Sequence, residues 1–317
     1  MEFRNLGDCG LKVSVAGLGC NNFGMTIDFP ESERVIQAAL DAGINFFDTA
    51  DCYGAGGSEE HLGKVLADKR HEVVIASKCG IPMGPGPLMG GASRRYVLQA
   101  CEASLKRLGT DYIDLYYMHT PDPNTPIAET LDAMNTLVDQ GKVRYTACSN
   151  MSGWQISEAS WEANTAGLRP FAAVQNEWSL LDRSIEAEAV PAAVHHGMGV
   201  IPYFPLASGV LTGKYKRGET FEADSRYGGG EGREMFHQMY GHFVSDESLE
   251  KAERLGEVAS AAGISLIELA LSWLASQDCV SSVIAGARTP EQVESNAKLT
   301  HGGLGRDVLE SVEKALA

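Results

Sequence analysis

Four polar side chains of the types that move protons follow apolar runs in the first part of the chain. Asp48 ends the run that begins at residue 44, Lys78 ends the run that begins at residue 73, and His119 follows the run 112–118. Tyr53 comes five residues after Asp48, just before a glycine turn. In neighbouring parallel strands the carboxyl ends lie on one side of the sheet, so these four side chains are expected to converge.

A tyrosine beside a lysine makes a usable proton donor. A phenol has an ordinary pKa of about 10, and a neighbouring ammonium group stabilises the phenolate and lowers that pKa. We therefore expect Tyr53 to protonate a developing alkoxide near neutral pH. Asp48 is expected to hold Lys78 and offset its charge, and a neutral His119 is expected to donate a hydrogen bond to the substrate oxygen.

Each of these residues also has an ordinary structural use. Asp48 could cap a helix or loop, Lys78 could be a solvated strand end, and His119, which precedes Pro121, could anchor a turn. Their joint position at three successive strand ends is what favours catalysis over these uses.

Apolar strand patterns and helical patterns alternate along the chain. Residues 1–15, around the turn at Gly7, predict a short hairpin. Ser58 is a candidate cap for the helix that follows Tyr53, and a final helix is expected to begin near Thr289 and Pro290. The expected strands are 13–19, 44–48, 73–78, 112–118, 145–149, 172–176, 199–204 and 280–285. The other expected helices are 31–41, 58–68, 93–108, 127–140, 152–166, 186–196 and two within 248–277.

Eight strand and helix units in 317 residues fit a closed (β/α)8 barrel better than an open sheet. Residues 17–24, which follow the first strand, lack the GxGxxG spacing of a Rossmann turn. No break in composition marks a domain boundary, so residues 1–317 are predicted to form a single α/β barrel domain with a short N-terminal β-hairpin. The long loops 80–91 and 206–247 are expected on the barrel face where lids and binding loops occur.

Composition limits the classes of partner. The chain has 44% hydrophobic and 21% charged residues, and its N-terminus has no basic segment followed by an apolar stretch, so we expect a cytoplasmic protein without a membrane anchor. A net charge of −16 argues against binding to nucleic acid or anionic membranes. Seven cysteines without a CxxC pair favour reduced thiols over disulfides or a zinc site, so no metal is predicted.

Several motifs resemble those of the aldo-keto reductases, a family whose fold is a (β/α)8 barrel. The similar segments run through nearly the whole chain in the same order. They are Asp48-Thr-Ala-Asp-Cys-Tyr53-Gly, Ser58-Glu-Glu-x-Leu-Gly63, Ala76-Ser-Lys78, Asp114-Leu-Tyr-Tyr-Met-His119, Gly141-Lys-Val-Arg-Tyr145, Ser149-Asn150, Gln175, the segment Tyr203 to Tyr215, and the segment Gly286 to Asn296.

The resemblance implies a catalytic tetrad of Asp48, Tyr53, Lys78 and His119, with Tyr53 as the general acid. It also implies NADP as the cofactor, with the hydride coming from the nicotinamide of NADPH. Such enzymes bind the nucleotide extended across the barrel mouth without a Rossmann domain, which agrees with the missing GxGxxG.

Further residues match the positions of the family's cofactor contacts. Ser149, Asn150 and Gln175 are implied to bind the carboxamide, although Ser149 and Asn150 could instead cap the next helix. Tyr203 is implied to stack on the nicotinamide ring. The loop implied to cover the pyrophosphate carries Leu206, Ser208, Gly209 and Lys214. The last motif supplies Gly286, Arg288 for the 2′-phosphate, and Gln292 and Asn296 for the adenine side. Arg288 could also be an exposed charge near a helix start.

The sequence departs from the family pattern at two positions near the cofactor. Phe204 stands where a small hydroxyl residue is most common, and Ser295 replaces the acid usually found before the last asparagine. An uncharged or aromatic carbonyl compound is expected in a pocket of apolar groups and sulfur. The expected walls are Asn22, Phe23, Met25, Cys52, residues 83–90, Thr120 and the loop 206–247.

These observations predict an NADPH-dependent reductase of a small-molecule aldehyde or ketone, and they leave the oligomeric state open. One alternative comes from residues 203–215, which also resemble the beta subunits of potassium channels; those share the barrel and act mainly as regulatory partners. The other alternative is a Schiff-base aldolase that uses Lys78. The aldolase hypothesis leaves Gln175, Lys214 and Arg288 unexplained.

Overall fold

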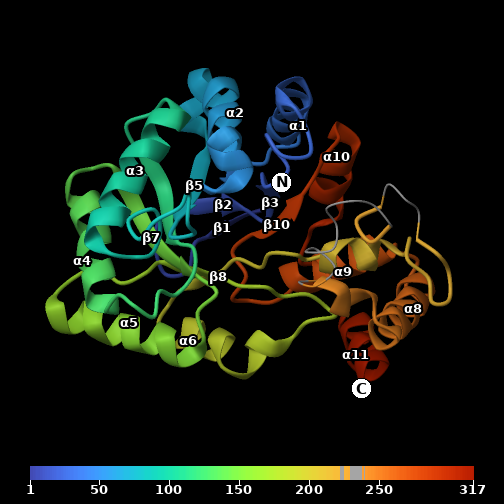
Figure 1. Ribbon diagram of the computed structural model, residues 1–317. Helices are drawn as coiled ribbons and strands as arrows, with labels where there is room; N and C mark the ends of the chain where they lie inside the picture. The colour runs from blue at the N-terminus through green and yellow to red at the C-terminus, as the bar shows by residue number, and fades with distance from the viewer. Residues whose placement is uncertain (222–224, 229–237, 239) are drawn as a thin grey trace.

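Eight parallel strands curl into a barrel that helices surround (Figure 1). The computed structural model describes residues 1–221, 225–228, 238 and 240–317. The strand order is β10-β3-β4-β5-β6-β7-β8-β9, and a parallel bridge between Val200 and Val280 joins the two edges. The strands are β3 (Ala16–Gly19), β4 (Phe46–Asp48), β5 (Val74–Cys79), β6 (Ile113–Met118), β7 (Val143–Ser149), β8 (Ala173–Gln175), β9 (Gly199–Val200) and β10 (Val283–Gly286). The predicted (β/α)8 barrel is confirmed.

The helices lie outside the strands, and local sequence sets where several of them begin. Asp28 caps the first helix: its Oδ1 accepts from the backbone N–H of Glu31 at 3.0 Å, and its own N–H donates to the Glu31 carboxylate at 3.1 Å. The helices are α1 (Phe29–Asp41), α2 (Gly57–Leu66), α3 (Arg94–Leu108), α4 (Ile127–Asp139), α5 (Gly153–Ala166), α6 (Ala189–His195), α8 (Asp246–Ala261), α9 (Leu266–Ala275), α10 (Pro290–Leu299) and α11 (Arg306–Leu316).

The predicted hairpin closes one end of the barrel. Strands β1 (Phe3–Asn5) and β2 (Lys12–Ser14) pair antiparallel, and the turn between them is held by a hydrogen bond from the Asp8 N–H to the Gly197 carbonyl at 2.9 Å. Leu6 and Val13 are fully buried in the apolar cluster inside the barrel. The hairpin therefore seals the end opposite the carboxyl ends of the strands.

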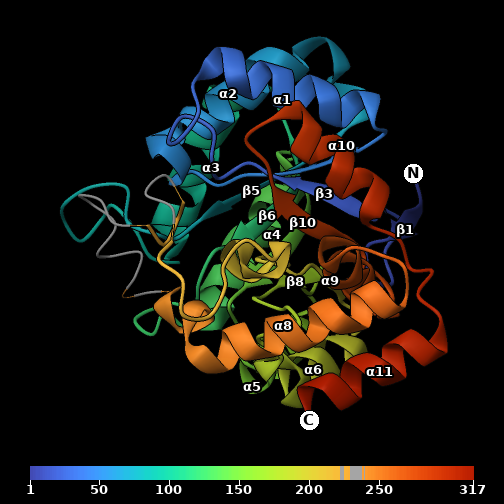
Figure 2. The same cartoon turned by 90° about the vertical axis from the view of Figure 1, so that its right-hand side faces the viewer.

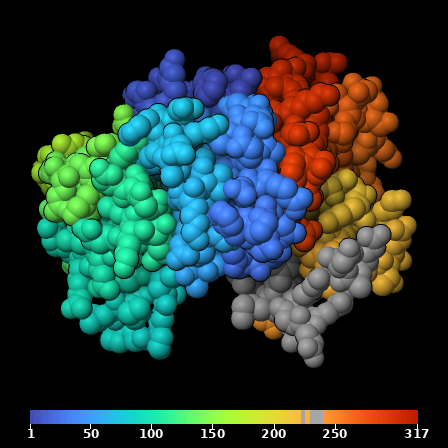
Figure 3. Space-filling model, turned by 90° about the horizontal axis from the view of Figure 1, so that it is seen from above, coloured from blue at the N-terminus to red at the C-terminus, as the bar shows by residue number. Residues whose placement is uncertain are grey.

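The ends of the chain complete the barrel wall. Helix α1 packs against α10, so the first and last segments lie side by side, as the blue and red atoms of Figure 3 show. Helix α11 packs against α8 near the C-terminus (Figure 2). The larger apolar cluster lies between strands and helices, and it holds the strand ends that carry the site in fixed positions.

Several predicted element bounds were wrong. The strand predicted at 13–19 divides into β2 and β3, because Ser14 turns its hydroxyl to the Ala16 carbonyl at 2.7 Å. Ser58 does not cap α2, because the cap position is Gly56 and the Ser58 hydroxyl instead donates to the Cys20 carbonyl at 2.8 Å. The strand predicted at 199–204 contains only β9, and α11 was not predicted. Thr289 caps α10 with Pro290 in its first turn, as predicted.

Among the described residues, no single helix has the length and apolar composition to cross a membrane. The pair α8 and α9 meets those two criteria together, but it is bent by 90°.

Candidate active site

Three neighbouring strands bring the predicted tetrad together. Asp48 is the last residue of β4, Lys78 lies near the end of β5, and His119 follows β6 directly. The strands pair in parallel, with Asp48 opposite Ala76, so their ends lie at the same barrel face. Tyr53 begins the short 3₁₀ turn Tyr53–Gly56 beyond β4.

A buried ion pair forms the base of the site. The Lys78 ammonium donates to Asp48 Oδ1 at 2.5 Å and to the Thr49 carbonyl at 2.9 Å. The other oxygen of Asp48 accepts from Gln175 Nε2 at 2.8 Å. Lys78 is fully buried and Asp48 is 2% exposed, so each charge depends on the other for compensation.

Burial and the ion pair shift the pKa of each partner in opposite directions. Burial alone would lower the pKa of Lys78, but the Asp48 carboxylate outweighs it and the pKa lies above its usual range. Burial raises the pKa of the Asp48 carboxyl, and the Lys78 ammonium and the Gln175 hydrogen bond oppose that rise. The short contact and the second donor favour the ionised pair, so Lys78 is a fixed positive charge.

Lys78 lies under Tyr53, but it does not lower the phenol pKa below its ordinary value. Its Nζ is 5.1 Å from the centre of the Tyr53 ring. Burial raises the pKa of Tyr53 to about 12, and the Lys78 charge offsets only part of that rise. The predicted net lowering was therefore wrong, because removal from water exceeds the charge effect in the free protein. Tyr53 keeps its proton at neutral pH, which is the form that a general acid requires.

His119 is a neutral imidazole against the same tyrosine. Burial, helped by the Lys78 charge, lowers the pKa of His119 to about 3. Its ring packs edge-on against Tyr53, with ring centres 5.9 Å apart. Its Nδ1 is 3.9 Å from Cys52 Sγ, and a thiol that donates there leaves the ring proton on Nε2. A neutral ring protonated at Nε2 can donate a hydrogen bond, which is the role predicted for His119.

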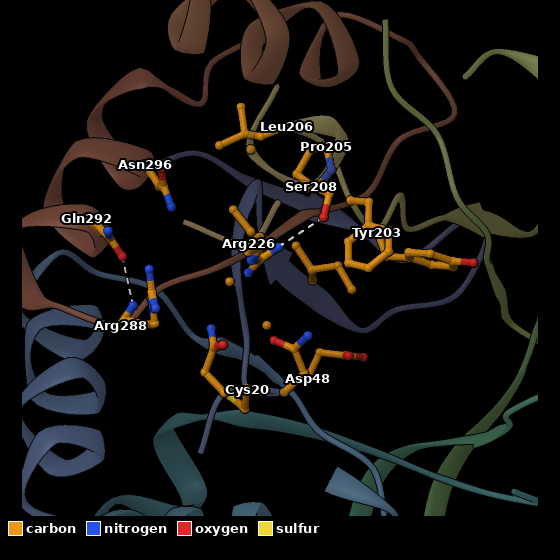
Figure 4. A pocket seen from close by; sticks show the side chains of 18 of the residues that line it. Cys20, Asp48, Tyr203, Pro205, Leu206, Ser208, Arg226, Arg288, Gln292 and Asn296 are labelled. Carbon is orange, nitrogen blue, oxygen red and sulfur yellow. Dashed lines mark hydrogen bonds between the residues drawn. The ribbon is translucent and has the colours of Figure 1, made fainter. Parts of the chain in front are cut away.

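A cavity of about 870 Å³ opens above the tetrad, within the usual size range of small-molecule sites. Every residue predicted for the tetrad or for a cofactor contact lines this cavity except Lys78, which is fully buried. Figure 4 shows Asp48 on one side, Tyr203 on another, and Arg288, Gln292 and Asn296 together on a third. The fold therefore collects residues that lie up to 248 positions apart, from Asp48 to Asn296, in one place.

The residues predicted for the carboxamide bond to one another in the free protein. Ser149 Oγ donates to the Gln175 carbonyl at 2.7 Å. Asn150 Nδ2 donates to the His119 carbonyl at 3.0 Å, and Asn150 Oδ1 accepts from the Tyr203 hydroxyl at 2.8 Å. Helix α5 begins instead with Ser152 as its cap, so Ser149 and Asn150 are not its cap.

The loop after Tyr203 has a backbone conformation, with positive φ, that residues other than glycine rarely adopt. Phe204, Ala207 and Ser208 have φ of 52°, 46° and 57°, and Gly209 has φ of 97°. Such left-handed residues cost free energy and persist where the surroundings require them, often at binding sites. The loop thereby turns Ser208 and Gly209 toward the cavity.

Three cationic side chains lie at the cavity rim. Lys214 and Arg288 are exposed, and Arg226 is partly buried and donates to Ser208 Oγ at 3.4 Å (Figure 4). None of the three forms an ion pair within the described residues. Burial, and to a lesser degree Arg288, lowers the pKa of the Arg226 guanidinium below its ordinary value, although it stays charged.

Arg226 was missed at the sequence level. It lies in a long loop without periodicity, between the loop residues predicted to contact the cofactor and residues 229–237, which lie outside the described residues. Its basic side chain in a chain of net charge −16 was the available signal.

The predicted substrate walls are partly wrong. Asn22 and Thr120 line the cavity, together with Cys20, Ile81 and Tyr240. Phe23 does not, because it is fully buried in the core between strands and helices. Met25 is 66% exposed, and neither it nor Cys52 is part of the lining. Within loop 206–247, residues 222–224, 229–237 and 239 lie outside the described residues.

Known proteins are similar to this sequence over nearly its whole length. A model of the aldo/keto reductase family matches residues 16–317. A "Probable voltage-gated potassium channel subunit beta" of Arabidopsis thaliana is 39% identical over 303 residues, covering 94% of this chain and 90% of that protein. An "L-glyceraldehyde 3-phosphate reductase" of Escherichia coli K12 is 34% identical over 306 residues, covering 94% and 87%.

A third relative, the "Aldo-keto reductase YhdN" of Bacillus subtilis, is 34% identical over 307 residues, covering 95% of this chain and 89% of that protein. The barrel, the strand-end tetrad and these matches agree with one another. This chain belongs to the aldo/keto reductase family.

Proposed function

We propose that this protein is an NADPH-dependent oxidoreductase that reduces an aldehyde or ketone to an alcohol. The observation that carries the proposal is the position of Tyr53, Lys78, Asp48 and His119 at the base of a cavity whose rim carries cations without an ion-pair partner in the part of the chain that the structure describes. A proton donor and a polarising group there face the same space that an anionic nucleotide would enter.

The rim fits a phosphorylated nucleotide. Lys214, Arg226 and Arg288 present positive charge without carboxylate partners among the described residues, which suits phosphate groups. Gly286 lines the cavity, is exposed and has no side chain, so a ligand can approach the backbone there. Lys214 and Arg226 would hold the pyrophosphate, Arg288 the 2′-phosphate, and Gln292 and Asn296 the adenine side.

Near the tetrad, Tyr203 offers an aromatic face for a nicotinamide ring. Ser149, Asn150 and Gln175 would exchange some of their mutual hydrogen bonds for bonds to the carboxamide. A nicotinamide bound there supplies the hydride.

The chain's own residues would then handle the oxygen of the substrate. The carbonyl oxygen binds between the Tyr53 hydroxyl and His119 Nε2–H, which polarise the carbonyl bond. As the carbon accepts a hydride with its electron pair, negative charge develops on the oxygen. Tyr53 gives its proton to this alkoxide, which is a stronger base than a phenolate, and the Lys78 ammonium stabilises the resulting phenolate.

A Tyr53→Phe variant tests the role of the phenol. It should bind NADPH as the parent does and should lose nearly all carbonyl reduction. Binding is measured by the quenching of the fluorescence of the four tryptophans. Tyr112→Phe removes a hydroxyl that contacts His71 away from the cavity and is the matched control. Preserved turnover in Tyr53→Phe would contradict the assignment.

A regulatory role is a second candidate, because one relative is described as a potassium channel beta subunit. Both roles use the same nucleotide site, so nucleotide binding alone does not separate them. Size-exclusion chromatography and capture of membrane partners, compared with a screen of aldehydes and ketones, would do so. Turnover without a stable partner supports the oxidoreductase; a stable channel partner without turnover supports the regulatory subunit.

The aldolase alternative fits the geometry poorly. A Schiff base needs a neutral amine, whereas Lys78 is fully buried and paired with Asp48, with its pKa above the usual range. Borohydride in the presence of a carbonyl compound should therefore leave Lys78 unmodified.

A further inference from the structure

Two side chains beside the tetrad, together with His119 of the tetrad, have the donor types that a zinc ion combines. A carboxylate oxygen of Asp51, Sγ of Cys52 and a ring nitrogen of His119 all lie within 4.8 Å of one another. Asp51 and Cys52 belong to the turn between β4 and Tyr53, and His119 comes from the end of β6. The fold thus assembles the set from two strands, without a spaced cysteine motif in the sequence.

The Asp51 carboxylate has no partner of its own. It is 1% exposed, and neither oxygen makes a hydrogen bond within the described residues. Burial and the Glu59 charge raise the pKa of the Asp51 carboxyl, and the Arg107 charge and the nearby Cys52 backbone N–H oppose that rise without satisfying either oxygen. Among the described residues, the other carboxylates of the fully buried class are paired: Asp48 with Lys78, Glu59 with Arg107, and Asp114 with Arg70. A buried carboxylate without a partner is costly, and a cation would compensate it.

The spacing is close to that of a tetrahedral site. Cys52 Sγ and His119 Nδ1 are 3.9 Å apart. A tetrahedral zinc ion, with bonds of about 2.3 Å to sulfur and about 2.0 Å to nitrogen, separates such ligands by about 3.5 Å. A rotation of the Cys52 side chain that shortens this separation by about 0.4 Å would match these two ligands to the ion, and the Asp51 oxygen, within 4.8 Å of both, would move in as the third.

The charges also balance. A doubly positive ion bound by one thiolate, one carboxylate and one neutral imidazole forms a neutral group. The bound group therefore carries no net positive charge beside the buried Lys78 ammonium, whereas a cation with neutral ligands would carry one.

We propose that Asp51, Cys52 and His119 form a site for a thiophilic divalent cation such as Zn²⁺, whose binding slows carbonyl reduction by fixing the His119 ring. On binding, the Cys52 thiol loses its proton to solvent, and bonds form from Sγ, an Asp51 oxygen and His119 Nδ1, with water as the fourth ligand. The slowing of the reaction rests on the proposed function, whereas the site does not.

Binding is measured first, on reduced protein purified without a polyhistidine tag. Calorimetric titration with Zn²⁺ should give about one ion per chain. Titration with Co²⁺ should produce the visible and sulfur-to-metal absorption of a tetrahedral thiolate site. Cys52→Ser and Asp51→Asn should each weaken binding by about 100-fold or more. Cys9→Ser, which removes another partly exposed thiol, should bind as the parent does.

Circular dichroism and thermal unfolding of the variants show that lost binding is not lost folding. Unchanged affinity in both Cys52→Ser and Asp51→Asn, or no stoichiometric ion in the parent, would overturn the site. Either result would count against the site whether or not the protein reduces carbonyl compounds, so the binding test is independent of the proposed function.

Turnover tests the second half of the proposal. Each protein is compared with and without Zn²⁺, and a chelator is then added. With Zn²⁺, the turnover of the parent and of Cys9→Ser should each fall about tenfold or more below the value without the ion, and the chelator should restore it. Cys52→Ser should be unaffected by the ion. A parent that binds the ion at this site and keeps its full activity would show that the site does not regulate the reaction.

Discussion

The base and the rim of the cavity hold their charges in opposite ways. At the base, Asp48 and Lys78 are buried, and each satisfies the other. At the rim, Lys214 and Arg288 are exposed and unpaired among the described residues. A charge at the base is therefore part of the folded core, whereas a charge at the rim is available to a ligand.

This difference predicts which substitutions should lower the free energy of unfolding as well as change binding or turnover. Removing one partner of a buried pair leaves an uncompensated charge, so changes at the base should cost both folding and chemistry. Removing an exposed cation costs little folding free energy, so changes at the rim should affect binding alone. Variants of both regions, measured for unfolding and for binding, test this separation.

The largest effect is expected for Asp48→Asn. It leaves the Lys78 ammonium buried without a carboxylate, so the free energy of unfolding should fall by about 3–5 kcal/mol and turnover should be lost. Urea unfolding followed by tryptophan fluorescence measures the first. The double variant with Lys78→Met removes both charges and should regain much of the stability but none of the turnover. A loss below about 1 kcal/mol in Asp48→Asn would remove the contrast with the rim.

At the rim, Arg288→Ala should leave stability within about 0.5 kcal/mol of the parent. It should weaken NADPH binding by about 10- to 100-fold, a loss of about 1.4–2.7 kcal/mol, and change NADH binding little, because only NADPH carries the 2′-phosphate. Tryptophan quenching gives both dissociation constants. Arg306→Ala, at a highly exposed arginine of α11, is the control. Equal losses for the two nucleotides would place Arg288 elsewhere on the ligand.

The base of the site is also the part that the sequence predicts best. Asp48, Lys78 and His119 each end an apolar run, and the parallel arrangement of such runs brings their ends together. What the pattern does not contain is the balance of opposing effects. The rise in the pKa of Tyr53 depends on how far burial exceeds the Lys78 charge, and only the three-dimensional arrangement sets that balance.

The rim is less predictable because its positions depend on irregular backbone. Ala207 and Ser208 take left-handed conformations that their residue types do not signal. Arg226 reaches the cavity from a loop with no periodic pattern. Helix α11 is different, since Val308, Leu309 and Val312 follow a helical spacing that was readable from the sequence.

A third variant examines Glu177, an acid outside the cavity lining that lies beside Tyr203. Glu177 forms an isolated parallel β-bridge with Tyr203. One of its carboxylate oxygens has no hydrogen-bond partner among the described residues. Burial, with Asp182 nearby, raises its pKa to about 7. An acid whose pKa is higher in the folded state than in the unfolded state keeps its proton to a higher pH when the protein is folded. The free energy of unfolding should therefore fall as pH rises from about 4.5 to about 7.

Glu177→Gln should remove this part of the pH dependence and be more stable than the parent at pH 8. Urea midpoints at several pH values measure it, with Glu310→Gln, an exposed acid of α11, as the control. Parallel pH profiles for the parent and Glu177→Gln would mean that the carboxylate is compensated in solution.

The smallest effect is expected where the rim meets a helix start. Thr289 caps α10 by accepting a hydrogen bond from the Gln292 N–H at 3.4 Å, and Arg288 immediately precedes it. Thr289→Ala should lower the free energy of unfolding by about 1 kcal/mol, well below the loss at Asp48, and Thr289→Ser should restore it. Because the cap also orders the turn that presents Arg288, NADPH affinity should fall by less than in Arg288→Ala. A loss of stability as large as that of Asp48→Asn would mean that rim and base are one cooperative unit.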